Sequence, residues 1–353
     1  MNYHQPNLID SIVSNSETPL RIDNHYRGEN FERLSGYKRQ GNESKIGSLA
    51  DPSKDLEQNF WDSGITNNPE IMPVHTMYNE QRIECPNNKA ILNTRTGKVI
   101  SVVSKSYEMI KNDMIYKAIE PNLQFLEPEH FISMNNTARC FVIMRIKNND
   151  QEVSEGDSIR RRLIFVNSFD GSYSFKVIQS DVRLWCFNQM GSIQNTKNKM
   201  TFSHRKGINS QLEKLAEFIS YQRDDLSNSI QEFKAMQNQP CSSSLLKEIF
   251  MHSFEDKLKG QITDKETKEK RDKKFSDIEN EFLKIKEFYN IESGSSQPNL
   301  YNAFNAITQY ETHEESSRVS ETESARIRFE GLIRGRLAER ILKARSKCLQ
   351  LTR

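Results

Sequence analysis

A carboxylate and several hydroxyl groups lie close together in residues 165–177, FVNSFDGSYSFKV. Apolar and polar residues alternate on both sides of Asp170-Gly171, which predicts two antiparallel strands joined by a tight turn. Aspartate and glycine are typical turn residues, because aspartate can bond its own backbone and glycine adopts positive φ. We therefore interpret Asp170 first as a residue that fixes the turn and second as a functional ligand.

A histidine and a cysteine near the end of the same predicted sheet could also take part in chemistry. His204 has Asp170 and Asp181 as conceivable partners, but HxH, HExxH and paired-carboxylate spacings are missing from the sequence. Cys186 lies in an apolar run, where a cysteine is usually a small buried hydrophobe. We predict no catalytic residue, no metal and no cofactor, and expect His204 to be structural; a metal-dependent hydrolase that uses Asp170 and His204 is a weaker alternative.

Nucleotide-driven chemistry has no motif to support it, since GxxxxGK[ST] and GxGxxG do not occur in the sequence. Whether the protein is an enzyme is thus left open, with a preference for a protein that binds without catalysis.

A basic cluster, Arg160-Arg161-Arg162, leads into the strand-like run LIFVNSF. On a strand, Arg160 and Arg162 share one face and Arg161 points to the other. With Tyr173 on the partner strand, these cations could form a platform on which single-stranded bases stack. The alternative, which we prefer, is that Tyr173, Phe175 and Val177 form the inward face of their strand.

The C-terminal segment carries the clearest local charge. Residues 318–353 contain ten basic and four acidic residues. A helical period places four of the basic residues on one face: Arg336, Arg340, Lys343 and Lys347. This face could neutralise phosphates, or it could be the solvated side of a surface helix.

Composition indicates a non-secreted protein with reduced thiols. The 353 residues carry a net charge of +2, and five cysteines occur without a CxxC pair. No run of about 18 apolar residues occurs and the N-terminus has no signal-peptide pattern, so we expect no membrane partner and a cytoplasmic location.

The patterns predict an α+β fold: a β-hairpin and a helix, followed by a curved antiparallel sheet packed by long helices. Residues 1–80 are polar and are expected to form an extended or disordered arm. Residues 81–240 would form the α+β core, with a hairpin turn at Thr96-Gly97 and one helix of some 25 residues from Ile208. Residues 241–353 would form a helical extension that ends in the basic helix.

Four motifs in order resemble a known family, the phage/plasmid-like proteins classed as domain of unknown function 932, over residues 90–240. The first is a V-S-x-x-Y strand end before a helix that opens at Asn; the second is an Asn-Ser-His-Asp-Gly-Ser turn. An Arg-Val-x-Cys-x-Asn strand and a His element follow. The matching positions are Tyr107, Asn112, Asn167, Ser168, Asp170, Gly171, Arg183, Cys186, Asn188 and His204.

Two positions depart from the family pattern. Phe169 stands where the turn often has His, and Ser203-His204-Arg205 replaces a His-Thr pair. Both changes weaken a catalytic interpretation. The resemblance implies work on mobile DNA or on a host, and the order of elements is similar to the folds of phage single-strand annealing proteins, as an analogy of fold only.

These observations predict a non-enzymatic DNA-binding protein that prefers single strands and that anneals them as a homo-oligomer. The residues expected to contact DNA are Arg160, Arg162, Tyr173, Arg336, Arg340, Lys343 and Lys347. The main alternative is a structural or interaction protein of a phage, part of the virion or of host takeover.

Overall fold

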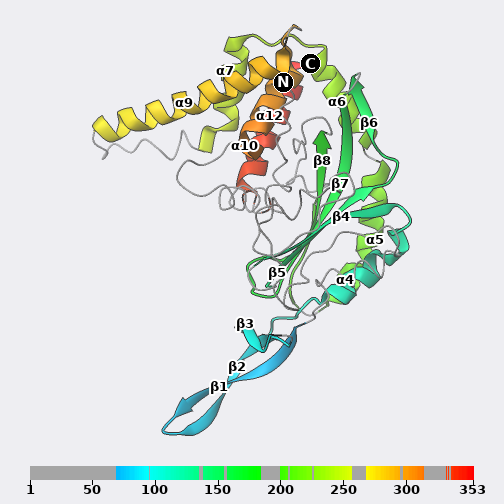
Figure 1. Ribbon diagram of the computed structural model, residues 1–353, viewed down its shortest axis with the longest axis vertical. Coiled ribbons are helices and arrows are strands. Elements are labelled where there is room, and N and C mark those ends of the chain that lie inside the picture. Colours follow the sequence, from blue (N-terminus) through cyan, green and yellow to red (C-terminus); the bar gives the residue numbers. More distant parts are fainter. Residues whose placement is uncertain are drawn as a thin grey trace, which may run out of the picture.

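The computed structural model describes residues 69–94, 96–134, 138–154, 157–183, 199–205, 207–224, 226–256, 268–294, 297–313, 331, 333 and 335–353. They form an α+β structure with two antiparallel sheets (Figure 1). This confirms the predicted fold class.

The smaller sheet has the order β1-β2-β3 and projects from the rest of the molecule (Figure 1). From here on we use the name arm for this sheet alone, and not for the segment 1–80. Its strands are β1 (Glu70–Tyr78), β2 (Gln81–Asn93) and β3 (Lys98–Ser104). The predicted turn at Thr96-Gly97 is confirmed, and Gly97 has the positive φ of 66° that favours glycine. β1 falls within the segment expected to be extended or disordered, and it is a paired strand.

The main sheet has the order β4-β5-β7-β8-β9, with β6 paired to β7. The predicted meander is confirmed for four strands, and two short strands were not predicted. One of them, β6, has low apolar content, and its pairing with β7 stabilises it as a strand. The strands are β4 (Leu126–Met134), β5 (Arg139–Ile146), β6 (Gln151–Ser154), β7 (Asp157–Ser168), β8 (Phe175–Arg183) and β9 (Lys199–Phe202).

Both faces of the main sheet are covered by helices. On one face Val142, Leu163 and Phe165 pack with α4 (Asn112–Ile119) and α5 (Ile208–Asp224), in what we call the α5 core. On the other face Phe141 and Ile143 pack with the remaining helices, in what we call the α10 core. These helices are α6 (Leu226–Gln237), α7 (Ser243–Ser253), α9 (Lys268–Ser293), α10 (Leu300–His313) and α12 (Arg336–Leu351).

The apolar stripe from Ile208 to Phe233 belongs to two helices, not to one as predicted. Leu215 and Ile219 of α5 lie in the α5 core, whereas Ile230 and Phe233 of α6 lie in the α10 core. A single stripe in the sequence therefore serves both faces of the sheet. The next helix, α7, is capped by Ser242, whose Oγ accepts the Leu245 N–H at 3.2 Å.

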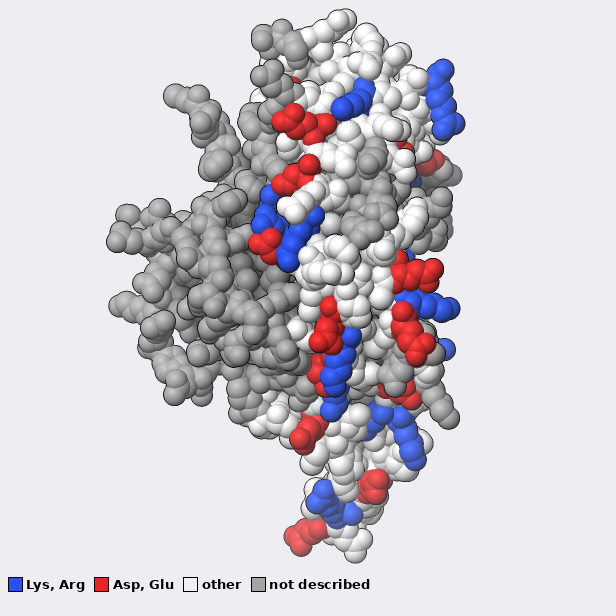
Figure 2. Space-filling model, turned by 90° about the vertical axis from the view of Figure 1, so that its right-hand side faces the viewer, with Lys and Arg blue, Asp and Glu red and all other residues white. Residues whose placement is uncertain are grey.

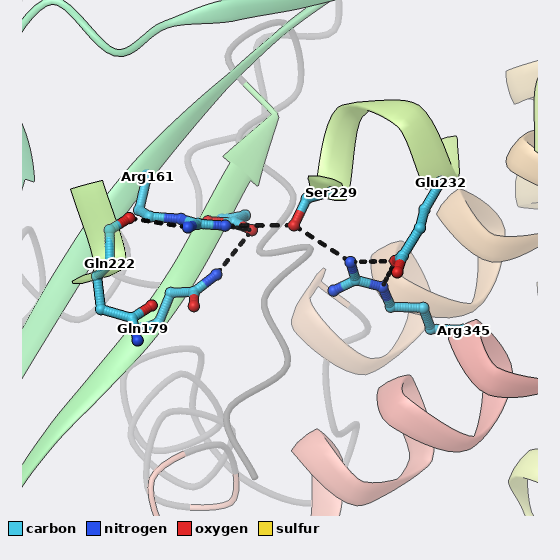
Figure 3. A network of polar contacts seen from close by, with 7 residues as sticks. Arg161, Gln179, Gln222, Ser229, Glu232 and Arg345 are labelled. Atoms are coloured by element: carbon cyan, nitrogen blue, oxygen red, sulfur yellow. Dashed lines mark hydrogen bonds and ion pairs between the residues drawn. The ribbon is translucent and has the colours of Figure 1, made fainter. Parts of the chain in front are cut away.

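A buried ion pair lies between the main sheet and the last turn of α5 (Figure 3). Arg161 of β7 and Asp181 of β8 are cross-strand partners with fully buried side chains, and Arg161 Nε donates to Asp181 Oδ1 at 2.7 Å. Arg161 Nη1 also donates to the Gln222 carbonyl at 2.9 Å, and Gln179 Nε2 donates to Asp181 Oδ2. The pair therefore joins two strands to the last turns of α5.

The same network continues into α6 and α12. Ser229 Oγ accepts hydrogen bonds from both Arg161 and Arg345, each at 3.2 Å. Arg345 in turn pairs with Glu232 (Figure 3). Burial alone would raise the pKa of Asp181, but the charge and hydrogen bonds of Arg161, with the charge of Arg345, hold this pKa below its ordinary value. The carboxylate is thus ionised inside the protein and orients its partners.

We expect Asp181→Asn to lower the free energy of unfolding by about 3–5 kcal/mol, because it leaves Arg161 buried without its counter-charge. The double variant Arg161→Met with Asp181→Leu should lose clearly less than the sum of its two single changes. Urea denaturation of the natural chain, Asp181→Asn, Arg161→Met, Asp181→Leu and the double variant measures these losses.

Arg160→Met is the matched control on the same strand. Its partner Asp150 is exposed, and the pair should contribute no more than about 1 kcal/mol. Equal losses for Asp181→Asn and Arg160→Met, or strict additivity of the double variant, would contradict a coupled buried pair.

Candidate functional site: a clasp between three segments

The structure brings together six residues that carry the family resemblance. We call Tyr107, Asn112, Asn167, Ser168, Asp170 and His204 the signature cluster. They come from the segment between β3 and α4, the end of β7 with the turn after it, and the residues after β9. The cluster therefore lies at the opposite end of β7 from Arg161.

Asn167 connects β7 to the start of α4. Its Nδ2 donates to the Ile110 carbonyl and to Asn112 Oδ1, both at 2.9 Å. Both asparagines are buried. A buried amide that uses both protons in this way fixes two backbone segments to each other.

Two hydroxyl groups, one on β3 and one in the segment that follows it, bond the backbone at the end of β7 and in the turn after it. Tyr107 Oη donates to the Ser168 carbonyl at 3.0 Å, and Ser101 Oγ donates to the Phe169 carbonyl at 2.6 Å. Burial raises the pKa of Tyr107 strongly, and the nearby Asp170 charge adds to this shift. The phenol therefore keeps its proton and acts as a donor.

Asp170 fixes the turn, as the preferred interpretation has it. Its Oδ1 accepts the Ser172 N–H at 2.9 Å, and its Oδ2 accepts Arg139 Nε at 3.0 Å. Burial raises its pKa, but the bonds from Ser172 and the charge of Arg139 outweigh burial and lower it. Gly171 has φ of 71°, which a side chain would strain.

The inside of the turn is also bonded. Ser168 Oγ donates to the Tyr173 carbonyl and accepts the Tyr173 N–H. Phe169, at the position where the family turn often has His, is buried in the α5 core. Its side chain serves packing.

His204 joins the residues after β9 to the same cluster. Its ring stacks on Tyr107 with centroids 4.7 Å apart and 13° between the planes. Its Nδ1 lies 3.1 Å from the Glu108 carbonyl, and the Glu108 N–H donates to the His204 carbonyl. Because a carbonyl only accepts, Nδ1 carries the proton. Burial lowers the pKa of His204, against backbone contacts with Glu108 and Tyr173 that raise it.

The arrangement acts as a clasp, because each residue of the cluster makes at least one hydrogen bond to another part of the chain. Asp170 and His204, the pair of the hydrolase alternative, bind different partners: Arg139 and the Glu108 carbonyl. Within the described ranges, no three His, Cys, Asp or Glu residues are grouped so that they could hold a metal ion.

The predicted stacking platform on the main sheet is wrong, because helices cover both sheet faces. Tyr173 is buried, with its ring edge against Phe141 at 6.0 Å in the α10 core. Tyr173, Phe175 and Val177 are all buried, as the preferred interpretation predicts. However, Tyr173 packs in the α10 core whereas Phe175 and Val177 pack in the α5 core, so the three residues do not share one face of the sheet. Arg162 is buried as well.

The predicted basic stripe of α12 is divided by its neighbours. Arg340 is buried and pairs with Asp256 at 2.6 Å and Glu311 at 3.2 Å, so its expected phosphate contact is wrong. The other members lie nearer the surface: Arg336 is exposed, Lys343 pairs with Glu339 at 3.2 Å, and Lys347 pairs with Glu248 at 2.6 Å. On the main sheet, Arg160 pairs with Asp150 at 2.7 Å.

Three further family positions lie at or beyond the end of β8. Arg183 ends β8, and Cys186 and Asn188 lie outside the described residues. Sequence reasoning missed Arg139 and Ser101. Arg139 faces Ser168 across β5 and β7, so a correct strand pairing would have placed it beside the turn.

Stability should depend on pH through His204. The unfolded histidine takes up its proton near its ordinary pKa of about 6.5, whereas the folded pKa is lower. The contribution of the neutral ring is therefore complete above about pH 6.5 and is lost as the pH falls below that value toward the folded pKa. Urea midpoints at about pH 7.5 and about pH 5 should differ less for His204→Gln than for the natural chain. Parallel loss in both proteins would contradict this assignment.

Comparison with known proteins gives a family. A family model described as "Domain of unknown function (DUF932)" matches residues 99–330. No curated protein and no solved structure matches the chain. Among the described residues, the helices are too short or too polar to cross a membrane. The match covers more than half of the sequence, and the chain belongs to the DUF932 family.

Proposed function

We propose that this chain is a non-enzymatic interaction protein that presents its arm to a macromolecular partner. The exposed apolar side chains of the arm carry this proposal. Of the twelve large hydrophobic residues that are exposed in the described part of the chain, seven lie in the arm. They are Ile71, Met72, Met77, Tyr78, Ile83, Val99 and Val102.

This concentration of apolar surface is unusual for a sheet with only three strands. A small sheet is stable when one face packs on something, and contiguous exposed apolar surface commonly marks a binding site. At the tip, Met77 and Tyr78 are 65% and 66% exposed, beside a two-residue turn at Asn79-Glu80. Side chains at such a tip contribute little to the fold and are available to a partner.

Charge gives no competing surface on the face shown in Figure 2. Lysine, arginine, aspartate and glutamate side chains alternate along its described part, with no extended patch of one sign. Interspersed charges keep a surface soluble and provide weak steering. This supports contact through apolar arm residues in preference to broad electrostatic attraction.

We also propose a reducing compartment such as the cytoplasm. Cys140, Cys241 and Cys348 are free thiols buried in the cores, where burial raises the pKa of Cys241 and Cys348. Such thiols pack as small apolar groups. They fit a cell interior in which thiols stay reduced.

The arm tip can be tested with a photo-crosslinking amino acid placed at Tyr78, and at Met251 on α7 as an exposed control. We expect a discrete adduct from position 78 alone. The partner identified in it should bind the purified chain, and Met77→Ser with Tyr78→Ser should weaken this binding at least about tenfold without lowering the melting temperature. Equal labelling at both positions, or unchanged binding by the tip variant, would refute an arm-mediated function.

Single-stranded DNA binding is a second candidate, and the outer residues of α12 favour it. The partners of Lys343 and Lys347 are carboxylates, Glu339 and Glu248, that are themselves more than half exposed. Exposed ion pairs contribute little free energy, so a phosphate could replace either carboxylate. Arg336 extends the same face at the start of the helix.

We expect the triple variant Arg336→Glu, Lys343→Glu and Lys347→Glu to weaken binding of a labelled oligonucleotide at least about tenfold in fluorescence anisotropy. Losing three phosphate contacts should reduce the salt slope by about 2. A control triple changes exposed lysines on other helices, Lys117, Lys214 and Lys234, to Glu with the same total charge. No binding at low salt, or equal weakening by both triples, would rule out this interface.

A further inference from the structure

One face of the arm near the body carries apolar residues, of which Met72, Val99 and Val102 are exposed. Its apolar residues are the cross-strand partners Met72, Ala90 and Val102 in one row, and Leu92 and Val99 in the next, where Glu70 is the partner of Leu92 on β1. Partners in register lie on the same side of a sheet. We call these five residues the outer face.

A bulge makes this face continuous. The register between β2 and β3 shifts between Ile91 and Leu92, which leaves Ile100 without a partner. Val99 and Val102, three residues apart, therefore point to the same side, and they are 57% and 55% exposed. Ile100 and Val103 pack on the other side against the α5 core.

β3 also has an open edge. Its only neighbouring strand in the described part of the chain is β2, and Figure 1 shows β3 at the side of the arm. The other edge strand, β1, is blunted, because Pro73 has no N–H to donate and a bulge follows between Pro73 and His75. β3, KVISVVS, has no proline, no glycine and a single charge. It is the edge suited to pairing with another strand.

We propose that β3 pairs antiparallel with β3 of a second copy of this chain, so that the two arms form one continuous sheet. This rests on the proposed function and adds a second contact of the arm, which β3 makes and the tip does not. A two-fold axis between Ile100 and Ser101 sets Val99 of each copy opposite Val102 of the other, which is possible because the bulge puts both on the outer face. The contact is thus complementary to itself.

The charge of β3 also favours the antiparallel pair over a parallel one. The one charged residue of β3, Lys98, stands at its first position. In the antiparallel pair the two lysines lie at opposite ends, opposite Val103 of the other copy. A parallel pair would set them side by side, which destabilises a sheet. β3 offers no carboxylate to a basic partner strand, so an identical strand fits it better than a basic peptide.

Sedimentation velocity of the full chain tests the pairing. We expect a reversible dimer whose Kd rises at least about tenfold in Val99→Lys with Val102→Lys, because four added cations would face one another. Phe275→Lys with Leu283→Lys, at exposed positions on α9, adds the same charge and should leave the Kd unchanged. Both variants change exposed residues, and an unaltered melting temperature confirms that they fold.

Cysteine crosslinking tests the register. Mixing Val99→Cys with Val102→Cys chains under mild oxidation should give a disulfide-linked dimer in higher yield than either chain alone. A monomer at all concentrations, or a dimer that the two lysines do not weaken, would overturn the pairing. Equal crosslinking of the single and mixed samples would overturn the proposed register. If the chain is a monomer but residue 78 still crosslinks a specific partner, only the β3 pairing is overturned. If the chain is a monomer and residue 78 crosslinks no specific partner, the proposed function is overturned as well.

Discussion

Burial of the main sheet on both faces is the constraint from which most other features follow. β7 is the middle strand, and it carries polar side chains at both of its ends inside the protein. Each must find a partner within the chain, since an unpaired buried charge or amide costs several kcal/mol. Arg161 meets Asp181 at one end and Asn167 meets Asn112 at the other. The two networks fix the helices of both layers to the same strand.

The same constraint changes the meaning of the charges on α12. A helix that packs on a core presents basic residues to its neighbours before it presents them to solvent. Arg340 and Arg345 both bind carboxylates from other helices and lie over aromatic rings, Arg340 over Phe254 and Arg345 over Phe233. Their charge therefore orients α12 on the α10 core. The basic residues of α12 that remain near the surface for an external ligand are Arg336, Lys343 and Lys347.

Sequence patterns were enough for the parts that depend on local chemistry. The Thr96-Gly97 hairpin, the Ser242 cap and the Asp170 turn each follow from residues within a few positions of one another. Burial of charged residues could not be predicted in this way. Arg340 finds Asp256 across 84 positions, and only the packing of two helices brings them together. The apolar residues of α5 and α6 recur with the period of a helix, as predicted. The period alone could not show that those of α5 pack on one face of the main sheet and those of α6 on the other.

The signature cluster marks a joint in the structure. β3 enters the body directly before Tyr107, and both Ser101 and Tyr107 bind the backbone that follows β7. The family match begins at residue 99, within β3, so β1 and β2 precede it. The residues that carry the family resemblance thus hold the base of the arm, while the outer strands of the arm lie beyond the match. A fixed joint with a separately specified arm suits a protein that binds partners, because the arm can change its contacts while the clasp keeps its position on the body.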